Sequence, residues 1–131
     1  MNQYAKAYAA TEAYSGVAYA DPHSLITQMF DGALKRIAQA KGAMERNEIA
    51  AKGTLISQAV AIIANLEGCL DLDNGGELAA NLSSLYEYMN LRLTEANINN
   101  DQSKLDEVIQ LILEIKSAWV QIAPQQTQQA G

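Results

Sequence analysis

Apolar residues recur at alternating steps of three and four along most of the chain, which is the spacing of one face of an α-helix. Four such stripes follow one another between the only two prolines, Pro22 and Pro124. The first two stripes are Ile26, Phe30, Ala33, Ile37, Ala40 and Met44, then Ile49, Ile56, Ala59, Ile63, Leu66 and Leu70. The other two are Leu78, Leu82, Leu85, Met89, Leu93 and Ala96, then Leu105, Val108, Ile112, Ile115, Trp119 and Ile122. Since β-branched residues never alternate with polar ones over a useful run, the pattern predicts an all-α chain.

Polar residues mark where these helices begin and end. Asp21 before Pro22 is typical of a helix start, with a capping carboxylate followed by proline in the first turn. In the turn Asp73–Gly76, Asn74 and Glu77 have the spacing of a capping box. The segment Asn97–Asp101 closes the third helix and caps the fourth.

Connections this short place consecutive helices antiparallel. We therefore predict an antiparallel up-down four-helix bundle over residues 21–123, with the last helix ending before Pro124. Residues 124–131 are rich in glutamine and are expected to form a disordered tail.

Residues 1–20 are expected to form a separate N-terminal arm, helical or extended, that carries four of the six tyrosines. A tyrosine has an apolar body and a polar tip, so it suits a contact that forms and releases. Tyr8 and Tyr14 are therefore candidates for a reversible lid over an apolar groove. A permanently docked segment and a frayed terminus are the alternatives.

The apolar arcs on the second and fourth helices are wider than a bundle requires, since a stripe of about 100° or slightly more is enough. Such surplus surface calls for a cover: the arm, a second copy of the chain or another protein. The alternative is a thick bundle whose wide faces are covered by its own arm. The residues expected to lie partly on a partner-binding groove are those beside the main stripes: Leu55, Ile62, Leu111, Leu113 and Val120.

Composition argues against catalysis and nucleic-acid binding. Nine Lys+Arg against 15 Asp+Glu give a net charge of −6, whereas nucleic-acid binding needs clustered basic residues. The single histidine, His23, and the single cysteine, Cys69, fall on different predicted helices, so they form no nucleophile–base pair. His23 is expected on the surface. Neither a Glu-x-x-His metal motif nor a phosphate-binding loop is present. We expect no enzyme activity, no metal and no cofactor.

No stretch has the signature of a secretory signal or of a membrane helix. The longest apolar run, Ala59–Ala64, is followed by Asn65 and falls well short of the ~20 residues that a membrane span needs. We expect a soluble cytoplasmic protein without membrane insertion.

Several segments in order then resemble one known family. They are His23–Leu34 (HSLITQMFDGAL), Gly75–Leu82 (GGELAANL) continuing through Leu85–Met89 (LYEYM), Ala96-Asn97 and Ala118-Trp119. Together they resemble the flagellar export chaperone (FliS) family over residues 14–122. Phe30 stands where the family frequently has tyrosine.

The resemblance implies a cytoplasmic chaperone that binds the C-terminal segment of newly made flagellin, blocks premature filament assembly and delivers flagellin to the flagellar type III export apparatus. It also implies that an N-terminal segment, with Tyr14 as the best-aligned position, covers part of the apolar surface and shifts when flagellin binds. The flagellar export gate is thus an expected partner, and an anti-sigma factor is a further candidate. Two alternatives stay open: a structural oligomer that buries its wide faces against its own copies, and an export adaptor for another substrate.

Overall fold

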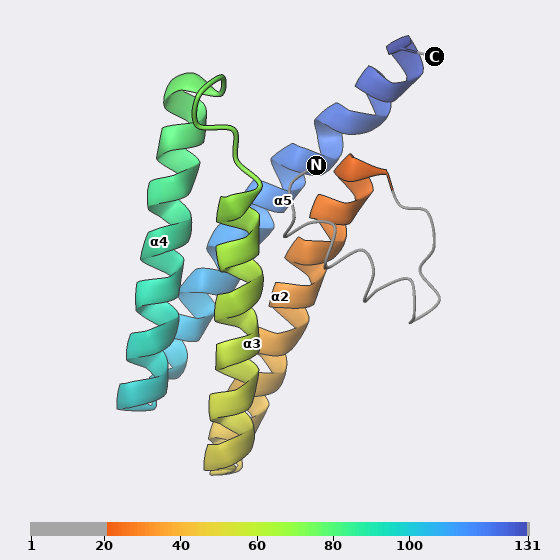
Figure 1. The fold of residues 1–131 in the computed structure, drawn as a ribbon. Coiled ribbons are helices and arrows are strands. Elements are labelled where there is room, and N and C mark those ends of the chain that lie inside the picture. Colours follow the sequence, from red (N-terminus) through yellow and green to blue (C-terminus); the bar gives the residue numbers. More distant parts are fainter. Residues whose placement is uncertain (1–20, 131) are drawn as a thin grey trace.

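The computed structural model describes the backbone of residues 21–130 and the side chains of residues 21–122, and four helices make up this part of the chain (Figure 1). They are α2 (Pro22–Glu45), α3 (Ile49–Gly68), α4 (Gly76–Asn99) and α5 (Gln102–Ala130). The described residues contain no strand, so the all-α prediction is confirmed. The expected arm, with Tyr8 and Tyr14, lies outside the described residues.

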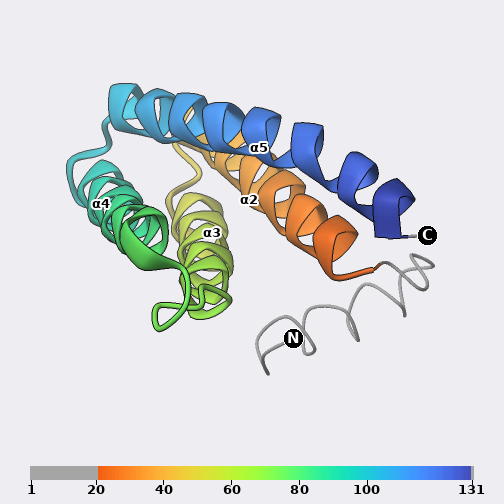
Figure 2. The same cartoon turned by 90° about the horizontal axis from the view of Figure 1, so that it is seen from above.

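The helices run alternately up and down and pack as a ring in which α2 contacts α3 and α5, and α4 contacts the same two helices. The predicted four-helix bundle is therefore confirmed. In Figure 1, α3 and α4 run side by side, whereas α5 crosses the bundle obliquely behind them. Figure 2 shows that the C-terminal end of α5 projects beyond the start of α2. The pair formed by α3 and α4 and the pair formed by α2 and α5 therefore diverge at the end of the bundle where α2 begins.

Local caps set two of the predicted boundaries. The carboxylate of Asp21 accepts a hydrogen bond from the Ser24 backbone N–H (2.7 Å), which satisfies a free donor in the first turn of α2 and lowers the pKa of Asp21. At the other end, Asn100 takes the left-handed conformation (φ 54°) that commonly ends a helix. Asp101 then accepts from the Ser103 backbone N–H (2.9 Å). Both expected boundaries are confirmed.

The turn between α3 and α4 differs from the prediction. Gly75, not Asn74, is the N-cap of α4, and no side chain bonds to the cap. The amide of Asn74 instead donates to the Asp71 carboxylate (2.9 Å), which lowers the pKa of Asp71. A Cβ atom at Gly75 would lie 2.5 Å from the Cβ of Ala79 and 2.6 Å from the carbonyl oxygen of Asp71. The tight turn therefore requires glycine at this position.

The last helix is longer than expected. We predicted that it would stop before Pro124, but the backbone of α5 stays helical to Ala130, so this prediction is wrong. A proline within a helix removes one N–H donor and crowds the preceding turn. In this case the glutamines that follow Pro124 favour the helix, since glutamine is among the better helix formers.

The centre of each predicted stripe forms the core. The residues with no exposed surface include Ala33, Ile37, Ala59, Ile63, Met89, Leu93, Leu105, Val108 and Ile112. The stripes are wrong at their ends, where Ile49 is 74% exposed, Leu78 70% and Ile122 48%. A periodic pattern gives the face of the helix but not the point at which its neighbours stop covering it.

By length and composition, α3 is the one helix among the described residues that could cross a membrane. Its two charged side chains are nevertheless matched to α4 and the turn after it. The ammonium of Lys52 is buried and donates to the Asn97 carbonyl oxygen (3.0 Å) and the Asn100 side chain (3.2 Å), and Glu67 accepts from the hydroxyl of Ser83 (2.6 Å). We therefore describe α3 as a helix of the bundle.

Candidate partner-binding grooves

An apolar groove of about 630 Å³ opens at the end of the bundle where the helix pairs diverge. All four helices contribute to it. We name it the end groove, and its apolar lining includes Ile26, Phe30, Leu66, Leu70, Leu78, Leu82, Ile115, Trp119 and Ile122. The groove arises because α5 crosses obliquely, so that the apolar stripes continue past the region where they face one another.

The floor and the rim of the end groove differ in exposure. Phe30 and Leu66 are almost fully buried and belong to the core, whereas Leu78 and Ile122 stand on the rim and are largely exposed. Tyr86 also lines the groove, and burial raises the pKa of its hydroxyl, so it stays neutral. The groove therefore offers a hydrophobic surface that already reaches the core of the bundle.

Among the described residues that line the end groove, the charged ones are both acidic, namely Asp71 and Glu114. The hydrogen bonds from Asn74 hold the pKa of Asp71 below its usual range, so this carboxylate is ionised at neutral pH. An apolar segment with basic residues beside its anchors would complement this surface.

Trp119 forms part of the groove wall and is held by the first turn of α2. Its Nε1–H donates to the carbonyl oxygen of His23 (3.1 Å). The imidazole of His23 stacks on the indole, with ring centroids 4.2 Å apart and planes 10° from parallel. We expected His23 on the surface, whereas it is half-buried against Trp119. The single histidine and the single tryptophan therefore form one contact between α2 and α5.

A second groove, of about 570 Å³, lies between α2 and α3 at the opposite end of the bundle. Small residues such as Ala38, Gly42 and Ala51 form much of its lining, together with Leu55. The ion pair of Arg46 with Glu48 (3.0 Å) connects the ends of the two helices beside it. We name this the α2–α3 groove.

The structure does not bring the predicted groove residues together. Leu55 lines the α2–α3 groove, and Leu111 is half-buried against the core. Leu113 and Val120 are exposed on α5 but line neither groove. Ile62 is 6% exposed and part of the core, so its expected place on a groove is wrong. The helical plot correctly placed Ile62 beside the stripe but could not show that a neighbouring helix covers it.

Sequence reasoning missed the end groove because its residues look like core. Leu78, Leu82, Trp119 and Ile122 all continue the main stripes, and we assigned them to the bundle interior. A signal was available in the turn Asp73–Gly76, which is rich in small and polar residues and offers little apolar surface to cover this end.

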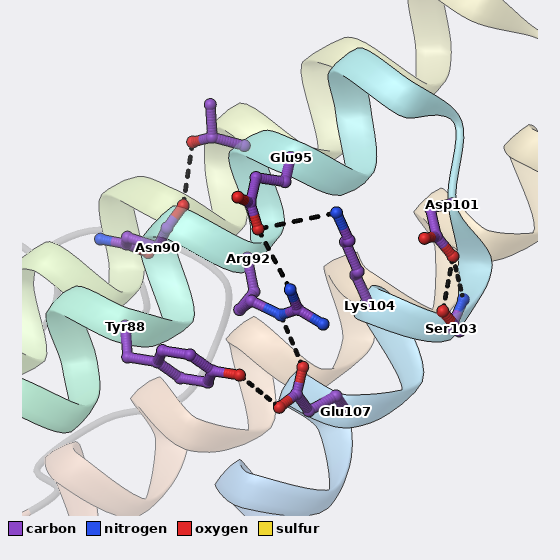
Figure 3. A network of polar contacts seen from close by, with 9 residues as sticks. Tyr88, Asn90, Arg92, Glu95, Asp101, Ser103, Lys104 and Glu107 are labelled. Carbon is purple, nitrogen blue, oxygen red and sulfur yellow. Dashed lines mark hydrogen bonds and ion pairs between the residues drawn. The ribbon is translucent and has the colours of Figure 1, made fainter.

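Polar contacts fix the rest of α5 in place. Arg92 and Tyr88 of α4 both donate to the carboxylate of Glu107, the Arg92 bond measuring 2.7 Å, and Arg92 and Lys104 both pair with Glu95 (Figure 3). The hydrogen bonds from Tyr88 and Arg92 hold the pKa of Glu107 below its usual range.

On its other side, α5 pairs with α2. The ammonium of Lys41 lies 2.8 Å from the Asp106 carboxylate, and Lys116 pairs with Asp31. These two pairs follow the antiparallel register of the helices. The contact between Trp119 and His23 continues the same series into the wall of the end groove.

The described residues therefore define an all-α helical bundle with two grooves at opposite ends, one of them strongly apolar. The sequence model described as "Flagellar protein FliS" matches residues 3–126, so the chain belongs to the FliS family of flagellar proteins.

Curated relatives agree with this assignment. The flagellar secretion chaperone FliSB of Pseudomonas aeruginosa is 53% identical over 114 residues, which are 87% of this chain and 90% of the relative. The flagellar secretion chaperones FliS of Salmonella typhimurium and Vibrio cholerae are 45% and 41% identical, and each match covers more than 85% of both chains. These relatives are named as chaperones and not as enzymes, as expected from the residues, and they support an export-chaperone role.

Proposed function

We propose that this protein is a cytoplasmic chaperone that binds the C-terminal segment of flagellin, prevents its premature polymerisation and delivers it to the flagellar type III export apparatus. The observation that carries the proposal is the end groove, an open apolar surface in a member of a family of flagellar secretion chaperones. A segment that polymerises through amphipathic helices would present the apolar anchors that such a groove accepts.

The two grooves favour a long, wrapped segment over a single short helix. The 20 residues of α3 span about 30 Å, and the grooves lie towards opposite ends of this helix. A ligand that fills both must therefore cover a comparable distance, which takes about 20 helical residues or about 10 extended ones. Each anchor side chain buried would contribute about 1.5–3 kcal/mol before the costs of association and ordering.

The N-terminal arm is the proposed lid. It joins α2 at Asp21, and Ile26 and Phe30 of the same helix line the end groove. Tyr14 precedes Asp21 by seven residues, a distance of up to about 25 Å when extended, so Tyr14 and Tyr8 could both reach the groove. In this proposal the arm covers the apolar surface in the free chaperone and leaves when flagellin binds.

The experiment compares two exposed aliphatic residues on α4. Leu78 lies on the rim of the end groove, whereas Ile98 is equally exposed and lines neither groove. We expect Leu78→Asp to weaken binding of a flagellin C-terminal peptide at least about tenfold in calorimetry, because a charge would replace an apolar contact. Ile98→Asp should bind as the unchanged protein does, and both variants should keep their far-ultraviolet helicity at 25 °C. Equal affinities in the two variants would contradict the proposal.

Sedimentation tests the rival oligomer in the same samples. A one-to-one complex with the peptide supports the chaperone, whereas a stable homo-oligomer that ignores the peptide supports the structural role. The export gate and an anti-sigma factor are further proposed partners, and co-purification with each tests them.

A further inference from the structure

We propose that His23 is a positioning residue for the end groove: it holds the indole of Trp119 as a fixed wall and so sets the affinity for the segment that binds there. The inference rests on the proposed function, since it concerns the same groove. It adds a role for the one histidine of the chain, which does not itself line that groove.

Both the backbone and the side chain of His23 contact the same indole. The carbonyl oxygen accepts the Nε1–H of Trp119 at 3.1 Å, and the imidazole lies flat on the ring system at 4.2 Å. A hydrogen bond alone would let the ring turn about the donor atom, whereas the stacked plane opposes this rotation. The two contacts together fix both the position and the tilt of the indole.

The stack depends on the side chain, but the hydrogen bond does not. Any residue at position 23 offers a backbone carbonyl, which is held in place by the cap of α2 at Asp21 and by proline at the first helical position. Removing the imidazole therefore removes the stack while leaving an acceptor for Nε1–H. The two contributions can be separated by substitution.

The imidazole acts here as a flat ring more than as a hydrogen-bonding group. Its Nε2 atom is buried and has no hydrogen-bond partner among the described residues. A buried polar atom without a partner is usually unfavourable, so shape and stacking must account for the placement of this ring. A phenyl ring should then replace it without loss.

A fixed indole matters because it belongs to the binding surface. Trp119 lines the end groove beside Ile115 and Ile122, and a bound segment would pack against it. When a side chain is already ordered before binding, no conformational entropy is lost in ordering it as the ligand binds, and affinity rises. His23 therefore acts through Trp119 and not by touching the ligand.

The test uses His23→Ala, His23→Phe and, as a matched control one helical turn further along α2, Thr27→Val. The control removes the hydrogen bond from the Thr27 hydroxyl to the His23 carbonyl (3.2 Å) but leaves the stack, and Thr27 does not line the groove. Three readouts are compared: binding of a flagellin C-terminal peptide, binding of the neutral dye Nile red, and the near-ultraviolet circular dichroism of the only tryptophan.

We expect His23→Ala to weaken binding of the peptide and the dye by about 2- to 10-fold, the range expected for one lost aromatic contact, and to reduce the tryptophan dichroism. His23→Phe should restore all three, and Thr27→Val should change none. The inference is overturned if His23→Ala binds normally, if His23→Phe fails to restore binding, or if Thr27→Val loses as much affinity as His23→Ala.

Failure of the underlying function would look different. If flagellin peptide does not bind the unchanged protein, the proposed function fails, while dye binding and dichroism still decide the role of His23. If His23→Ala also loses far-ultraviolet helicity, the comparison between His23→Phe and the unchanged protein decides, because the phenyl ring preserves the packing; a weak His23→Phe variant would then overturn the inference.

Discussion

Substituting aspartate at Ile62 and at Leu113 gives opposite predictions for two residues that the sequence placed in the same group. Ile62 is 6% exposed and packs within the core, whereas Leu113 is 43% exposed on α5. Ile62→Asp would forfeit about 1.5–3 kcal/mol of apolar burial. It would also place a carboxyl group in the core, at a further cost of several kcal/mol.

The sum is comparable with the total stability of a typical domain, about 5–15 kcal/mol. We therefore expect Ile62→Asp to be largely unfolded at 25 °C. Leu113→Asp should cost only about 1–2 kcal/mol, because this side chain loses part of its apolar burial and aspartate is a weaker helix former than leucine. Urea titration followed by far-ultraviolet circular dichroism measures both. A cooperative Ile62→Asp transition at the original midpoint would refute the placement of Ile62 and the packing of α3 that depends on it.

Three contacts and the proposed lid give four further predictions. Gly75→Ala should destabilise the protein by about 1–3 kcal/mol in urea titration, because its Cβ would overlap the carbonyl of Asp71; an unchanged midpoint would mean that this turn rearranges freely. The pKa of Glu107 is lower in the folded state than in the unfolded state. Its contribution to stability is therefore present above its pKa in the unfolded state and is lost as the pH falls through its pKa in the folded state. Glu107→Gln should therefore lose less stability on acidification than the unchanged protein. The pKa of Glu87 is raised in the folded state, first by its hydrogen bond with Glu67, so protonated Glu87 favours the folded state at low pH and this contribution is lost as the pH rises. Glu87→Gln should therefore stabilise the protein at pH 7. An unchanged stability at pH 7 would argue against the Glu67–Glu87 pair. Deleting residues 1–16 should leave helicity intact and speed or strengthen binding of the flagellin peptide, and unchanged kinetics would count against a lid.

The helices and their order could be predicted because the information is local. The stripes give the buried face of each helix. Asp21 begins α2 and Asn100 ends α4, each through contacts with residues nearby in the sequence. Where the evidence lies within a few residues along the chain, the sequence is sufficient.

The groove could not be predicted because it depends on how far neighbouring helices cover one another. Ile62 and Leu78 are both apolar residues on predicted helices, yet the first is buried and the second exposed. The extent to which neighbouring helices cover each residue decides this, and no pattern within a single helix encodes it. His23 illustrates the same limit, since its stacking partner lies 96 positions away.

In the proposed function, the end groove receives the C-terminal segment of flagellin. Trp119 is the only tryptophan of the chain and lines this groove, so its fluorescence reports directly on occupancy. Titration with a flagellin C-terminal peptide that lacks tryptophan should give a saturable shift in emission that ends at one peptide per chain. A peptide that binds by calorimetry but leaves the emission of Trp119 unchanged would contradict binding in the end groove.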